Sequence, residues 1–204
     1  MGDWLAPLEA SAPDVVASFR AFVHGKTVAL RREVRRRSGA GTAAGIVEQL
    51  EAVTGALLAI VGGLPDEAFA MAGGEEDWTV AEAIGHDIAA RQGLVLAASL
   101  AASGRWPAGA PTVVPGVPGP ATASRDELSS RLALSQRVIA RAARSIAGHE
   151  LDDCPLDHPL VGGLRCGEWL LFAGVHDLMH LEQLHRLGVE FGQVAALGAW
   201  GAVL

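Results

Sequence analysis

The stretch GEWLLFAGVHDLMHLEQLHRL, residues 167–187, predicts a long helix. Its histidines His176 and His180 stand four residues apart, so they project from nearly the same side of a helix, with Cβ atoms roughly 6 Å apart. Gln183 lies on that side too, about one turn further along. Two imidazoles at this spacing can bind one metal ion without distorting the helix.

Helical periodicity predicts four more helices before this one, and no strand alternation or internal repeat stands out. Two of them begin with a capping box, in which a Thr or Ser and a Glu three residues later satisfy the first backbone N–H groups. The predicted fold is therefore all-α, a four-helix bundle with one extra N-terminal helix. We expect residues 1–44 to form the N-terminal extension and residues 45–204 the bundle domain. The predicted helices cover residues 12–37, residues 44–61, a segment after Thr79, and a segment that starts at Ser124 and ends at Gly148.

His86 falls on the helix predicted after Thr79, among small and apolar neighbours that place it inside the bundle. With His176 and His180 it would supply three neutral ligands and leave positions on a metal ion open for chemistry. The alternative is that these histidines are hydrogen-bonded core residues, because helices contain histidines four apart by chance. The spacing alone does not choose between the two.

Several neighbouring residues are assigned plainer roles. A zinc protease motif needs Glu after the first histidine, and Asp177 stands there instead. Asp87 and Asp177 each follow a candidate ligand and point about 100° away on a helix, so we expect them to be exposed, and a hydrogen bond to a different imidazole is the alternative. His158 precedes a proline in the loop before the last helix and is expected to be an ordinary loop histidine, with an approach to the metal site as the alternative.

The composition excludes some classes of function. The net charge of −7 argues against broad binding to nucleic acid, which needs a basic face. No apolar run reaches the roughly 18 residues that span a membrane, and the N-terminus lacks the pattern of a signal peptide. We therefore expect a cytoplasmic protein with no membrane partner and two free cysteines. Residues 103–123 contain five prolines and predict a long loop near an open end of the bundle, and the apolar tail 189–204 is expected to pack on the bundle or at a subunit contact.

Two parts of the chain together resemble the DinB/YfiT-like superfamily. The first is DWTVAEAIGH at residues 77–86, and the second combines HPLVGGL at 158–164, EWLLF at 168–172 and HDLMHLEQL at 176–184. The resemblance covers residues 46–187. It implies a four-helix bundle, often dimeric, in which His86, His176 and His180 bind a divalent metal. Zinc is the first expectation for the metal, with nickel or iron as alternatives.

The resemblance also implies a class of reaction. Characterised relatives include enzymes that use the low-molecular-weight thiols mycothiol or bacillithiol, so we expect a metal-dependent S-transferase or isomerase that acts on a small electrophilic substrate. Gln183 is the candidate for a substrate contact, and a homodimer is expected. A metal-dependent hydrolase with a metal-bound water is the second hypothesis. A non-catalytic binding or stress protein is the third.

Overall fold

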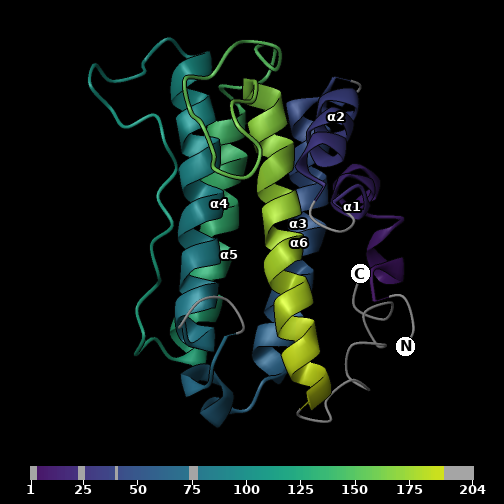
Figure 1. Ribbon diagram of the computed structural model, residues 1–204, viewed down its shortest axis with the longest axis vertical. Helices are drawn as coiled ribbons and strands as arrows, with labels where there is room; N and C mark the ends of the chain where they lie inside the picture. Colours follow the sequence, from purple (N-terminus) through teal and green to yellow (C-terminus); the bar gives the residue numbers. More distant parts are fainter. Residues whose placement is uncertain (1–3, 23–25, 40, 74–77, 191–204) are drawn as a thin grey trace.

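Four long helices form a bundle in the computed structural model, which describes residues 4–22, 26–39, 41–73 and 78–190. They are α3 (Ala43–Gly63), α4 (Val80–Ala102), α5 (Arg125–Ala143) and α6 (Cys166–Glu190). Each packs against two others, so that α4 and α6 lie side by side and α3 and α5 complete the bundle (Figure 1). Apart from isolated β-bridges, the regular structure of these residues is helical, which confirms the predicted all-α fold.

The N-terminal region differs from the prediction, because two helices replace the single one expected over residues 12–37. They are α1 (Pro13–Arg20) and α2 (Thr27–Ser38), preceded by a short 3₁₀ helix, η1 (Ala6–Leu8). Both α1 and α2 contact α6, and they also contact each other. Gly25 falls between them in the sequence, and glycine inside a helix costs about 1 kcal/mol relative to alanine. Two short helices can each pack an apolar side against the bundle, whereas a single straight helix over residues 12–37 could not. The division of the chain near residue 44 stays a prediction.

Local sequence signals set most of the helix starts. Thr79 caps α4 and Ser124 caps α5, and in both cases the glutamate three residues later completes the predicted capping box. The C-terminal ends of two helices differ from the prediction. The helix α5 stops at Ala143, before Gly148, and α6 continues past Gly188 to Glu190. The rest of the apolar tail, residues 191–204, lies outside the described residues.

The long segment between α4 and α5 runs back along the outside of α4, so that α4 and α5 point in the same direction (Figure 1). The sequence predicted a loop gathered at one end of the bundle, and the structure instead spreads it along the helix. Its far end is held where Gly119 donates its N–H to the Glu82 carbonyl at 2.9 Å. A Cβ atom on Gly119 would lie 2.4 Å from the Cα of Gly85, so glycine at both positions permits this close approach.

The helix α3 is long and apolar enough to cross a membrane by length and composition alone. In this fold it is a bundle helix that packs against α5 and α6. Its buried side chains include Ile46, Leu50, Val53 and Leu57, which belong to the same core as the apolar residues of α6. Core helices of soluble proteins pass the same test of length and composition, and the predicted cytoplasmic location stays a prediction.

Candidate metal centre

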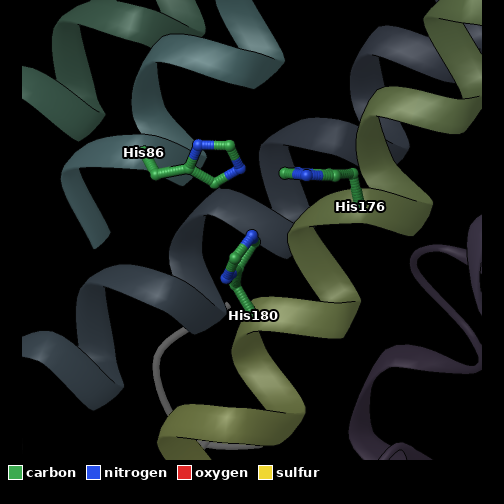
Figure 2. A group of neighbouring side chains, drawn as sticks. All are labelled: His86, His176 and His180. Atoms are coloured by element: carbon green, nitrogen blue, oxygen red, sulfur yellow. The ribbon is translucent and has the colours of Figure 1, made fainter. Parts of the chain in front are cut away.

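Three imidazoles from two neighbouring helices meet inside the bundle. His86 comes from α4, and His176 and His180 come from α6 (Figure 2). The ring centroids lie 5.5 Å apart for His86 and His176, 5.4 Å for His86 and His180, and 4.7 Å for His176 and His180. One ring nitrogen from each residue lies within 4.8 Å of the other two. His176 and His180 are buried, and His86 is partly exposed.

Each of the three rings is held through its Nδ1 atom by a different acceptor. His86 Nδ1 lies 2.8 Å from the carbonyl oxygen of Val117. His176 Nδ1 lies 3.2 Å from Oδ1 of Asp87, and His180 Nδ1 lies 3.1 Å from Oε1 of Gln183. Because carbonyl, carboxylate and amide oxygens only accept, each Nδ1 carries the proton of a neutral ring. The lone pair is therefore on Nε2 in all three residues, which is the form that binds a metal.

The charge state of the His176–Asp87 pair agrees with this assignment. Burial lowers the pKa of His176, against the opposing effect of its hydrogen bond to Asp87, so the ring favours its neutral form. Burial alone would raise the pKa of Asp87, but the hydrogen bond from His176 and the nearby charges, that of Arg91 among them, lower that pKa. Asp87 is therefore ionised at neutral pH and keeps the Nδ1 proton of His176 in place.

A cavity of about 220 Å³ opens beside His86 and His176. Its walls come from α4, from the segment between α4 and α5, and from the loop before α6. The ring of Trp78 lies 4.9 Å from that of His86. The lining residues are Trp78, His86, Ala90, Leu94, Val114, Pro115, Gly116, His158, Pro159 and His176.

A family model described as the DinB superfamily matches residues 49–184, two thirds of the chain. The chain belongs to the DinB superfamily. The match contains all three clustered histidines and both helices that carry them. No curated protein and no solved structure matches this DinB chain.

His158 lies in the wall of this DinB cavity, whereas the sequence predicted an ordinary loop histidine. The backbone N–H of Leu160 donates to its Nδ1 at 3.0 Å, so the proton of the neutral ring is on Nε2. Burial, and then the nearby His176 and His86, lower the pKa of His158 to about 4. At neutral pH this side chain is therefore an uncharged hydrogen-bond donor. Its place in the loop that leads into the helix of the histidine pair was the signal that could have predicted its position.

The two aspartates that follow candidate ligands are buried, which corrects the prediction that they face solvent. Asp87 reaches from α4 to His176 on α6. Asp177 reaches in the opposite direction and forms an ion pair with Arg91 of α4, with Nη2 and Oδ2 3.0 Å apart. Burial raises the pKa of Asp177 well above its ordinary value, and the positive charge of Arg91 opposes this effect. The helix of Asp87 was predicted to be mostly buried, and charges on buried helices must be paired.

Gln183 has two protein partners. Its Oε1 atom accepts from His180, and its Nε2 atom donates to the carbonyl oxygen of Gly73. The residue therefore connects a candidate ligand to the segment before α4. Its predicted contact with substrate stays a prediction, as does metal binding by the three histidines.

Proposed function

We propose that this DinB chain is a metal-dependent enzyme that joins a low-molecular-weight thiol, such as mycothiol or bacillithiol, to a small electrophile, as a transferase or isomerase. His86, His176 and His180 hold the metal in this proposal. The observation that carries it is the set of Nδ1 partners, because each ring is held through Nδ1 and keeps Nε2 free, and one ring nitrogen of each histidine lies within 4.8 Å of the other two. A histidine cluster that served only the core would not need this common arrangement.

The donor set suits zinc first and nickel or iron next, because all three bind neutral imidazole. A divalent cation that is held by uncharged ligands keeps its full charge and lowers the pKa of a thiol that reaches it. The protein supplies the positions of the reactants. The cavity beside His86 and His176 can hold an electrophile next to that thiol, and such proximity replaces a large entropy cost of reaction.

His158 is proposed to assist the electrophile. Its Nε2–H is the donor of a neutral ring, and the ring lines the cavity. When a thiolate adds to an electrophile, negative charge develops on the electrophile, and a positioned donor stabilises that charge. Because the pKa of His158 is about 4, the residue donates a hydrogen bond at neutral pH without becoming cationic.

A thiol reaction is favoured over hydrolysis because none of the described residues at the cavity is placed as a base. Asp87 accepts from His176, and Asp177 is paired with Arg91. The Nδ1 atom of His158 is already used by a backbone N–H. Among the described residues that line the cavity there is no carboxylate. Attack by a metal-bound water is commonly assisted by a general base, whereas a thiol of lowered pKa is a strong nucleophile without one.

The test begins with metal content. We expect the purified protein to hold close to one equivalent of metal by elemental analysis, and substitution of His86, His176 or His180 by Gln to abolish it. His149→Gln is the matched control, because His149 is exposed and pairs with Asp152 away from the cluster. Turnover is then measured with mycothiol or bacillithiol and chlorodinitrobenzene.

Three results would oppose the proposal. Bound metal with hydrolysis that needs no thiol would favour the hydrolase. Bound metal without turnover of either kind would count against catalysis. Absence of metal from the wild type after loading would leave the non-catalytic binding or stress protein. Homodimer formation, which is also a proposal, is tested separately by light scattering.

A further inference from the structure

A second hollow adjoins the cavity of the candidate metal centre. It measures about 460 Å³, roughly twice the first, and lies between α4 and the segment that runs back along α4. Five residues line both spaces, so the two adjoin along a shared wall. The shared residues are His86, Ala90, Leu94, Val114 and Pro115.

The walls of this second hollow are uncharged. Apart from His86, every lining residue is aliphatic, proline or glycine: Ala89, Ala90, Gly93, Leu94, Pro111, Val113, Val114, Pro115, Val117 and Leu156. Val113 and Val117 are 58% and 56% exposed, so apolar surface is left open to water at this place. Burial of such surface against an apolar group is favourable at about 25 cal/mol per Å².

The wall opposite α4 is fixed by the fold. The N–H of Val114 donates to the carbonyl of Asp157 at 2.9 Å, and the N–H of Asp157 donates to the carbonyl of Thr112. Val113 and Asp157 form a parallel β-bridge. The floor on α4 is open, because a Cβ atom on Gly93 would meet nothing within 4 Å. A preformed apolar space of this kind favours binding without the cost of ordering a loop.

We propose that this hollow holds an uncharged aliphatic or aromatic arm of the substrate whose reacting atom lies at His86, His176 and His180. The inference rests on the proposed function, and it names the substrate class. Because His86 stands in the walls of both spaces, one molecule can reach the histidine cluster and the hollow together. Recognition of carboxylate or phosphate arms calls for Arg or Lys, and neither is among the described residues that line the hollow.

The test uses n-alkanethiols from ethanethiol to hexanethiol and protein loaded with Co²⁺, whose visible spectrum changes when a thiolate binds. We expect the dissociation constant to fall about fourfold for each added methylene that is buried, until the hollow is filled. A dissociation constant that is independent of chain length, with Co²⁺ bound, would overturn the inference and leave the proposed function standing.

Two glycine variants locate the effect. Gly93→Leu places a side chain in the hollow, and Gly55→Leu places the same side chain on the exposed side of α3, where a Cβ also meets nothing within 4 Å. We expect Gly93→Leu to bind hexanethiol no better than ethanethiol while its Co²⁺ content and ethanethiol affinity stay those of the wild type. Gly55→Leu should keep the full dependence on chain length. An unchanged dependence in Gly93→Leu would overturn the inference.

A metal-free measurement separates this inference from the proposed function. Titration calorimetry with 1-hexanol on the metal-free protein should detect binding to the wild type and to Gly55→Leu, and none to Gly93→Leu. If Co²⁺ does not bind, the proposed function fails, and the calorimetric result still decides whether the hollow takes an apolar chain. Equal heats from all three proteins would refute the hollow as a binding site.

Discussion

Replacement of Arg91 by methionine should destabilise the bundle strongly, because this side chain connects all four long helices. It belongs to α4, and its Nη2 atom lies 2.8 Å from the hydroxyl oxygen of Thr54 on α3. Its Nη1 atom donates to Ser135 of α5 at 2.7 Å, and the ion pair with Asp177 reaches α6. The side chains of Arg91 and Asp177 are both 0% exposed. Removal of the guanidinium leaves a buried carboxylate without its countercharge.

The magnitude follows from that uncompensated charge. Breaking a buried ion pair from one side costs about 3–5 kcal/mol, which is a large part of the roughly 5–15 kcal/mol that stabilises a typical domain. The loss should depend on pH. The pKa of Asp177 is already raised by burial, and it rises further when Arg91 is absent. A carboxyl whose pKa is higher in the folded state binds more protons there, so stability falls as pH rises through that window. The variant should therefore lose more stability at pH 8 than at pH 5.

The assay is urea unfolding of the metal-free protein at both pH values. Arg137→Met on α5 is the control, because Arg137 is exposed and its loss should change the unfolding free energy by less than about 0.5 kcal/mol. The double variant Arg91→Met/Asp177→Leu should recover much of the loss, since it removes both charges. A loss below about 1 kcal/mol at pH 8 would refute the reasoning, as would a double variant that is less stable than Arg91→Met.

Three further outcomes are expected. Asp87→Asn removes the charged acceptor of the His176 Nδ1 proton and should weaken metal binding about 10- to 100-fold, measured by competition with a chromophoric chelator. An affinity equal to that of the wild type would count against His176 as a metal ligand. His158→Gln should flatten the rise in unfolding free energy between pH 4 and 6.5, because the pKa of His158 is about 4 in the folded protein and the unfolded chain takes up the proton first as pH falls. The change should not exceed about 2 kcal/mol for this partly exposed ring. An unchanged slope would contradict this prediction. Gly119→Ala should lower the melting temperature and the metal affinity, since its Cβ would collide with Gly85. The control Gly116→Ala should change neither, because a Cβ at Gly116 meets nothing within 4 Å. Equal behaviour of the two variants would disprove the close-contact argument.

The sequence predicted those features that depend on local chemistry. The capping boxes at Thr79 and Ser124 fix helix starts through side-chain bonds within four residues, so no knowledge of packing was needed. The helical spacing of His176 and His180 is also local. Their meeting with His86 needed the packing of α4 on α6, which the resemblance to a known family supplied and the structure shows.

The features that the sequence missed, or gave only as the less favoured alternative, depend on contacts across helices. Asp87 follows a candidate ligand on α4 and bonds His176 on α6. Asp177 follows a candidate ligand on α6 and forms an ion pair with Arg91 on α4. Periodicity places such residues on a neighbouring side of their own helix and says nothing about what lies opposite. The break between α1 and α2 was missed for a similar reason, because it lets both helices contact α6.

In the proposed function, the segment that returns along α4 would connect substrate binding to the orientation of a candidate ligand. Val117 supplies the carbonyl that accepts from Nδ1 of His86, and its side chain also lines the apolar hollow. Gly119, two residues later, holds the segment to Glu82. A substrate arm in the hollow, as proposed, would therefore rest against the same backbone that fixes one of the three imidazoles. Displacement of this segment would disturb the hollow and the histidine together, whereas His176 and His180, which are held from α4 and α6, would keep their partners.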